Sequence, residues 1–204
     1  MRLLLTISIL LLFISCKDDK DVQQDYQQEI EKQRRNKDKL FQSEGSPLKE
    51  DDLENFKGLV YYPIHEVFKI TARLVPTPWD EPFTMPSTGK RSDRYVRYGI
   101  AKFEIAGQQI QLNVYQNLDA APQEKYLFIP FKDATSGDDT YGGGRYLDIK
   151  YKDTPPQDSI LLDFNLAYNP YCVYNSNFSC PIPPKENWLS VKIEAGEKDF
   201  PPGK

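Results

Sequence analysis

Apolar and polar side chains alternate along most of the chain after residue 60, which is the pattern of β-strands that bury one face. Two such runs flank Ala106 and Gly107, a two-residue turn signal that predicts a β-hairpin. The predicted strands are 67–75, 94–105, 109–115, 125–131, 145–151, 159–164 and 188–194. Because no long helical pattern separates them, we expect a mainly β fold, an antiparallel barrel with a sandwich as the alternative.

Residues 16–43 precede this region and are almost wholly polar, without Gly or Pro. Val22, Tyr26 and Ile30 recur at a spacing of four, which favours a helix with one weak apolar stripe. We interpret the segment as a polar tether or helix whose C-terminal part docks on the domain that follows.

The β domain is assigned to residues 44–198. At its start, Ser46 and Pro47 predict a short capped helix that runs to Phe56. Residues 199–204 are expected to form a loose tail. The chain has 204 residues, of which 39% are hydrophobic and 13% aromatic, enough for one buried core and therefore for one domain.

Residues 1–15 have the pattern of an export signal. A positive Met1-Arg2 precedes an apolar run from Leu3 to Ile14, which is too short for a membrane span of about 20 residues. Charge begins directly after Cys16. The junction resembles a bacterial lipoprotein signal, in which that cysteine carries acyl chains such as palmitate; an ordinary signal peptide with an unrelated cysteine is the alternative.

The Lys-Asp-Asp run after Cys16 resembles a surface-export signal of Bacteroidetes lipoproteins. We therefore expect an outer-membrane lipoprotein held by lipid on Cys16, at the cell surface or, alternatively, at the periplasmic face. The net charge of -4 provides no basic surface, which argues against nucleic acid as a partner. A glycan or an envelope protein is the expected partner.

Residues 131–198 concentrate the side chains that bind polar ligands. Three glycines before Arg145 can aim backbone N–H groups at an anion, and Tyr with Asn at a rim is typical of carbohydrate sites. The alternative is that Arg145 pairs internally with an aspartate and that the glycines serve the backbone. The candidate ligand-binding residues are Asp133, Thr135, Ser136, Arg145, Asp148, Asp163, Asn165, Tyr168, Asn169, Tyr174 and Asn187.

Two functions follow from these residues. The first is binding of a small polar ligand, glycan or envelope partner by the β domain. The second is a hydrolase that acts on glycans with a carboxylate pair such as Asp133 and Asp163 and without histidine, because two nearby carboxylates suffice for glycosidic bonds. His65 is the single histidine and lies far along the chain from the polar segment.

Cys172 and Cys180 are the two cysteines beyond Cys16, and export would place them where disulfides persist. We predict that they form a bridge, with two separate buried thiols as the alternative. Two cysteines and one distant histidine do not provide four zinc ligands, so no metal site is predicted. No cofactor is expected.

Several runs occur together in the order known from one family. They are Phe131-Lys-Asp-Ala-Thr-Ser-Gly137, Tyr141-Gly-Gly-Gly-Arg-Tyr-Leu-Asp148, Asp163-Phe-Asn-Leu-Ala-Tyr-Asn-Pro170 and Cys180-Pro-Ile-Pro-Pro184. Over about residues 30–198 the chain resembles the bacterial and archaeal family called domain of unknown function 1684. The resemblance implies a shared fold and implies no activity.

Overall fold

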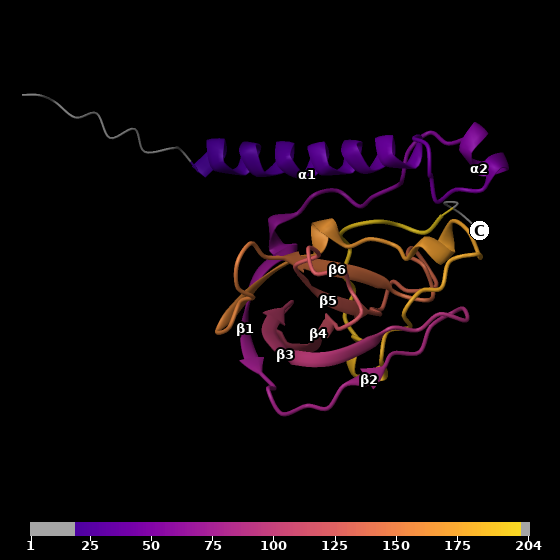
Figure 1. The fold of residues 1–204 in the computed structure, drawn as a ribbon. Helices are drawn as coiled ribbons and strands as arrows, with labels where there is room; N and C mark the ends of the chain where they lie inside the picture. Colours follow the sequence, from indigo (N-terminus) through magenta and orange to yellow (C-terminus); the bar gives the residue numbers. More distant parts are fainter. Residues whose placement is uncertain (1–18, 201–204) are drawn as a thin grey trace, which may run out of the picture.

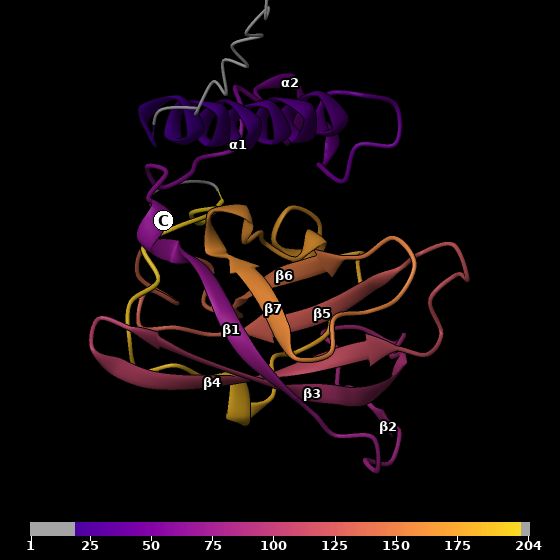
Figure 2. The same cartoon turned by 90° about the vertical axis from the view of Figure 1, so that its left-hand side faces the viewer.

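A computed structural model describes residues 19–200, so the predicted signal peptide and Cys16 lie outside the described residues (Figure 1). One seven-stranded antiparallel sheet has the order β6-β5-β4-β3-β1-β7, with β2 paired to β3. The sheet curls into a half-barrel (Figures 1 and 2), which confirms the mainly β, barrel-like prediction. Its strands are β1 (Lys69–Pro76), β2 (Phe83–Thr84), β3 (Arg94–Ile105), β4 (Gln108–Asn117), β5 (Tyr126–Phe131), β6 (Arg145–Lys150) and β7 (Ser159–Asp163).

The hairpin of β3 and β4 is the longest paired region and matches its prediction. Its register runs from Tyr95↔Asn117 to Ile105↔Gln108. Ala106 and Gly107 adopt φ values of 50° and 75°, the left-handed pair that a two-residue turn between twisted strands requires. Local sequence therefore sets the register of the sheet's centre.

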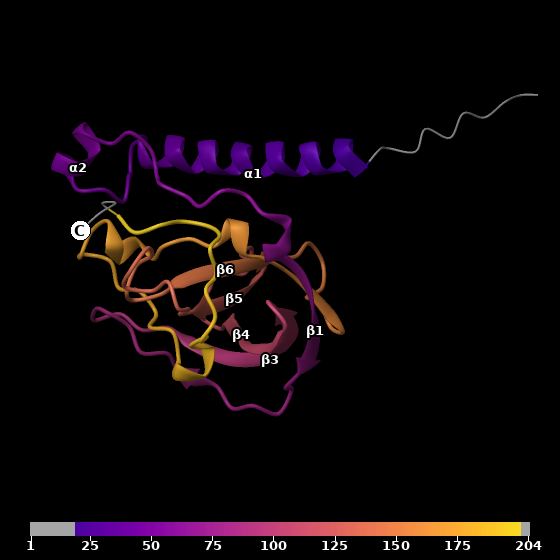
Figure 3. The same ribbon diagram turned by 180° about the vertical axis from the view of Figure 1, so that it is seen from behind.

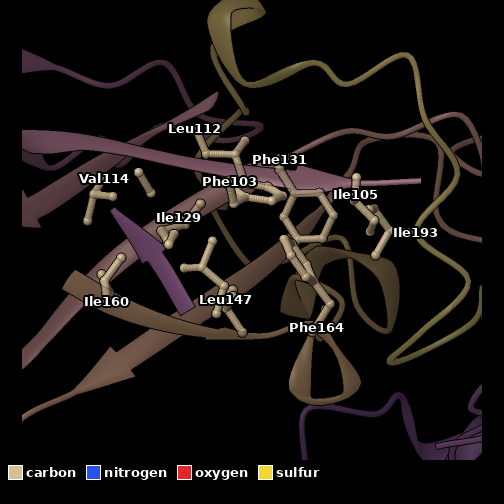
Figure 4. Close-up of a cluster of buried hydrophobic side chains, with 14 of the residues drawn as sticks. Phe103, Ile105, Leu112, Val114, Ile129, Phe131, Leu147, Ile160, Phe164 and Ile193 are labelled. Atoms are coloured by element: carbon tan, nitrogen blue, oxygen red, sulfur yellow. The ribbon is translucent and has the colours of Figure 1, made fainter. Parts of the chain in front are cut away.

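The main core fills the concave side of the curled sheet (Figure 4). Alternate side chains of each strand enter it, for example Leu112 and Val114 from β4 and Leu147 from β6. Phe131 and Phe164 meet edge to face, with ring centroids 5.4 Å apart, where the chain leaves β5 and β7. A smaller cluster that includes Tyr95, Phe128 and Tyr146 packs on the opposite face.

The strand predicted at 188–194 is wrong. Only isolated backbone bonds hold it, in which Leu189 N–H donates to the Lys132 carbonyl and the Val191 carbonyl accepts from Ala134 N–H. Further along, the N–H of Ile193 donates to Asp133 and the carbonyl of Ile193 accepts from Arg145. The apolar alternation is real, because Val191 and Ile193 are buried, but side chains replace the neighbouring strand.

The two edge strands, β6 and β7, approach each other, and the chain after β7 bridges them. Tyr146 and Tyr168 exchange both backbone hydrogen bonds, at 2.8 and 3.0 Å. We call this junction the seam. It links the free edge of β6 to the chain that follows β7, so this part of β6 is not left as an open template for another strand.

Helix α1 (Asp19–Phe41) lies across this side of the sheet as a separate layer (Figures 1 and 3). Ile30 is 2% exposed, Phe41 is fully buried, and the Tyr26 hydroxyl donates to Asp163 at 2.9 Å. Val22, the first residue of the predicted stripe, is 53% exposed. The helix therefore docks along its length from Tyr26 onward.

The segment after α1 differs in detail from its prediction. Helix α2 (Glu50–Glu54) begins later than expected, and Lys49 at its N-cap position makes no side-chain cap bond. Ser46 instead donates to the Phe41 carbonyl, because the unpaired carbonyls at the end of α1 need donors. The remaining helical turns are η1 (Glu66–Phe68), η2 (Phe164–Leu166), η3 (Tyr171–Val173) and η4 (Lys185–Asn187).

Of the predicted loose tail, Phe200 packs on Tyr174 with ring centroids 5.2 Å apart, and residues 201–204 lie outside the described residues. Within residues 19–200, no helix has both the length and the apolar character that a membrane crossing needs.

Candidate functional site: a groove between α1 and the seam

A groove runs between α1 and the seam, and we call it the seam groove. Its polar half has a volume of about 450 Å³ and is lined by side chains that include Arg34, Tyr61, Asn165 and Glu197. Its apolar half has a volume of about 620 Å³ and is lined by side chains that include Leu40, Tyr146, Tyr171 and Phe178. Four residues line both halves and make them continuous: Lys37, Asp148, Lys150 and Tyr168.

Strand β6 supplies one wall because its side chains alternate. Arg145 and Leu147 point into the core, whereas Tyr146, Asp148 and Lys150 reach the outer face, over which α1 lies. The Tyr168 hydroxyl donates to Asp148 Oδ2 at 2.9 Å. The seam therefore places a carboxyl group and a phenol side by side at the centre of the groove.

Asp148 is the carboxyl group with the most perturbed surroundings in the groove. Its Oδ1 atom is buried and has no hydrogen-bond partner among the described residues. Burial raises the pKa of Asp148 above its usual range, and the hydrogen bond from Tyr168 opposes this. Asp148 thus binds a proton more readily than an exposed aspartate does.

Arg34 forms the opposite wall from α1. Its guanidinium lies 4.4 Å from the centroid of the Tyr61 ring and donates to the Tyr62 carbonyl at 3.0 Å. Its Nε atom is buried and has no acceptor among the described residues. The polar half therefore contains both an unused acceptor, on Asp148, and an unused donor.

Glu197 is at the end of the groove and is fully committed to internal contacts. Its Oε1 accepts from Lys37, and its Oε2 accepts from Asn169 N–H at 2.8 Å and from Tyr174 at 2.7 Å. Lys37 also lies over the Tyr168 ring, 4.7 Å from its centroid. The pair of Lys37 and Glu197 thus neutralises itself and fastens α1 to the seam.

The predicted site residues fall into three groups. Asp148, Asn165 and Tyr168 line the seam groove. Asn169 and Tyr174 are buried and reach it through Glu197. The others do not line the groove: Asp133, Thr135, Ser136, Arg145, Asp163 and Asn187.

Arg145 is the clearest member of the third group. Its side chain is 0% exposed, and it donates to Asp133 at 3.2 Å and to the Ile193 and Glu197 carbonyls at 2.9 and 3.1 Å. Thr135 donates to the same Asp133 at 2.8 Å. This is the internal pairing that the sequence left open, and it gives Arg145 no exposed atom.

The glycines before Arg145 serve the backbone. Gly144 has a φ of 97°, and a Cβ atom there would lie 2.5 Å from the Phe131 carbonyl oxygen. Only glycine avoids that overlap. The run therefore makes the close turn by which the chain enters β6.

Asn187 joins strands β4 and β5 where they pair at few positions. Its amide donates to the Asn113 and Pro130 carbonyls at 2.9 and 2.8 Å and accepts from Asn113 N–H at 2.8 Å. The side chain thereby replaces a missing pair of backbone partners in the sheet.

Asp163 and Asp133 are not brought together for acid–base catalysis. Asp163 accepts from Tyr26 at 2.9 Å and from Asn165 N–H at 3.1 Å, so it caps η2 and anchors α1. Asp133 lies beneath Arg145 in the core. Neither aspartate lines the seam groove.

Cys172 and Cys180 are free thiols in the structure, so the predicted disulfide is absent from it. They are nevertheless neighbours: Cys172 N–H donates to the Cys180 sulfur at 3.1 Å. A hydrogen bond from the Cys180 thiol lowers the pKa of Cys172 to about 6.

Sequence patterns missed the α1 wall of the groove. Tyr26, Ile30, Arg34, Lys37 and Phe41 recur at steps of three or four, so they form one helix face. Counting the long aliphatic stems of Arg and Lys as apolar surface would have extended the weak stripe to Phe41.

The comparisons place this fold among known proteins. No curated protein matches the chain. The solution NMR structure of the uncharacterized protein from gene locus rrnAC0354 of Haloarcula marismortui matches with a TM-score of 0.70 and 33% identity, over 89% of this chain and 97% of that one. A family model, described as "Protein of unknown function (DUF1684)", matches residues 54–198. The sheet, the seam and the groove wall on β6 all lie within that match, and this chain belongs to the DUF1684 family.

Proposed function

We propose that this protein is an exported, lipid-anchored protein whose β domain binds a hydroxyl-bearing ligand, such as a glycan, in the polar half of the seam groove. The observation that carries the proposal is the pair of unused polar atoms there, Asp148 Oδ1 and Arg34 Nε. A buried polar atom without a partner costs about 1–3 kcal/mol, which a bound ligand would recover.

A ligand with several hydroxyl groups fits these two atoms because each hydroxyl can donate or accept. Asp148 requires a donor and Arg34 requires an acceptor. The groove also has charges of both signs, since Arg34, Lys150 and Asp148 line it and Lys37 is paired with Glu197. Such a mixture favours a neutral polyhydroxylated molecule over a strongly charged one. A volume of about 450 Å³ is within the range of small-molecule sites.

Binding to a glycan array tests the proposal. The chain from Lys17 onward, which contains every described residue, is expected to bind at least one glycan. Asp148→Asn should weaken that binding at least about tenfold, because a hydrogen bond to a charged group contributes about 1.5–3 kcal/mol. Asp153→Asn is the matched control, since Asp153 is exposed and outside the seam groove. An array without any bound glycan, or equal weakening by both variants, would contradict the proposal.

Export bears on the two thiols as well. In an oxidising compartment the neighbouring Cys172 and Cys180 would form the disulfide predicted from the sequence, which would stabilise the domain by roughly 2–3 kcal/mol. Protein isolated from the envelope without reductant should resist alkylation at both positions until it is reduced. Free labelling of both thiols in unreduced protein would exclude the bridge.

A further inference from the structure

The apolar half of the seam groove is an exposed apolar surface next to a polar one. Leu40 is 52% exposed, and Tyr171 and Phe178 are 38% and 37% exposed. The two rings meet edge to face at 5.3 Å, which holds them in place. Large apolar groups that gather in a hollow mark a surface that an apolar partner covers.

Charge is distributed unevenly along the groove. In the apolar half, the charged residues among the described lining are Lys37, Asp148 and Lys150, and all three stand at the junction with the polar half. Beyond them the lining is Leu, Pro, Tyr and Phe with a few small polar groups. One continuous cavity is therefore polar at one end and apolar at the other.

We propose that the ligand of the seam groove is amphipathic, with a hydroxyl-bearing head in the polar half and an alkyl chain in the apolar half, as in a glycolipid. This deepens the proposed function and rests on it. The four shared residues fix the junction between head and chain, with the Tyr168 ring forming part of both halves. A chain lying against Leu40 and Phe178 would cover apolar surface that is otherwise in water.

A series of alkyl β-glucosides tests the chain directly. Methyl, butyl and hexyl glucoside are titrated into the chain from Lys17 onward by calorimetry, below the concentrations at which they self-associate. Each CH2 that enters the groove should lower Kd by about two- to fourfold, so hexyl glucoside should bind at least about 30-fold more tightly than methyl glucoside. A Kd independent of chain length would overturn the inference.

Two matched substitutions on α1 locate the chain. Leu40→Gln should flatten the dependence of Kd on chain length, whereas Val22→Gln should leave it unchanged. The two residues are 52% and 53% exposed on the same helix, and Val22 lies outside the groove. Phe178→Ser, on the opposite wall, should flatten the dependence as well. Equal slopes for Leu40→Gln, Val22→Gln and the unmodified protein would contradict the assignment.

The two proposals fail differently. If glycans bind and Asp148→Asn weakens them while alkyl length has no effect, the polar site stands and the amphipathic ligand is wrong. If neither array glycans nor any glucoside binds, the proposed function itself is wrong.

Discussion

The Arg145 guanidinium makes its contacts inside the protein. Its guanidinium is surrounded by the carboxylate of Asp133 and by three carbonyls of the chain that follows η4, those of Ile193, Ala195 and Glu197. No neighbouring strand donates hydrogen bonds to those carbonyls, so the Arg145 side chain supplies the donors that a β-sheet partner would otherwise supply. The residue that most resembles a ligand clamp in the sequence is a structural replacement for a strand.

Arg145→Met should therefore reduce the free energy of unfolding by about 3–5 kcal/mol, because it leaves Asp133 charged, buried and unpaired. Urea denaturation measures the loss. Arg94→Met is the control: Arg94 pairs with Asp119 at the surface, and exposed pairs contribute about 0.2–1 kcal/mol. A loss at Arg145 no larger than at Arg94 would contradict this role.

Asp148 should make stability depend on pH. Because burial raises its pKa in the folded protein, the folded state holds the proton after the unfolded chain has lost it. Unfolding free energy should thus fall as pH rises from about 4, the pKa of an unfolded aspartate, through the higher folded value. Asp148→Asn should remove this decline, so the stability of the variant relative to the unmodified protein should increase as pH rises.

Melting temperatures of both proteins between about pH 4 and pH 7 give the comparison. Asp153→Asn, an exposed site, controls for the change of net charge. Parallel profiles for Asp148→Asn and the unmodified protein would show that the carboxyl is not destabilised by burial.

Among the elements, those determined by local sequence were predictable. The β3–β4 hairpin follows from a turn pair and two alternating runs, and all of its information lies within 24 residues of chain, Arg94–Asn117. The segment 188–194 alternates equally well but pairs with side chains from distant Asp133 and Arg145. Alternation of apolar and polar residues indicates that one face is buried. It does not indicate which groups form hydrogen bonds with the backbone.

The candidate site was predictable in part for the same reason. Asp148 and Tyr168 could be chosen because polar residues crowd that stretch of the chain. The side chains that surround them could not be predicted, since Arg34 and Lys37 belong to a helix more than a hundred residues earlier in the chain. Asp133 and Asp163 have similarly polar sequence neighbours, but their carboxylates accept hydrogen bonds from Arg145 and Tyr26 inside the fold.

Helix α1 should unfold together with the β domain, as one cooperative unit, rather than detach from it separately. Ile30 lies on the buried face of α1 and is 2% exposed, so Ile30→Ala should reduce the free energy of unfolding by about 2–5 kcal/mol. Val22→Ala, at an exposed position of the same helix, should change it by less than about 0.5 kcal/mol.

Hydrogen exchange separates the two arrangements of α1. If Ile30→Ala leaves global stability intact and only speeds amide exchange within α1, the helix detaches by itself and the groove opens with it.

In the whole molecule, α1 closes the seam and also connects the domain to the predicted anchor. Cys16 precedes the start of α1 at Asp19 by three residues, which span at most about 10 Å when extended. The groove residues Gln33 to Leu40 follow about 20–30 Å farther along the helix, at 1.5 Å per residue. A lipid on Cys16 would thus keep the groove within about 40 Å of the membrane surface, where amphipathic ligands are found.

Cys16→Ala should move the protein from the membrane fraction to the soluble fraction, because several acyl chains on one cysteine supply the anchoring free energy, at about 0.8 kcal/mol for each buried CH2. Fractionation of cells with detection of the chain measures this. Cys172→Ala is the matched control and should stay with the membrane, since Cys172 lies within the folded domain. Retention of the Cys16→Ala protein in washed membranes would contradict lipidation of Cys16, and the inferred closeness of the groove to the membrane would lose its basis.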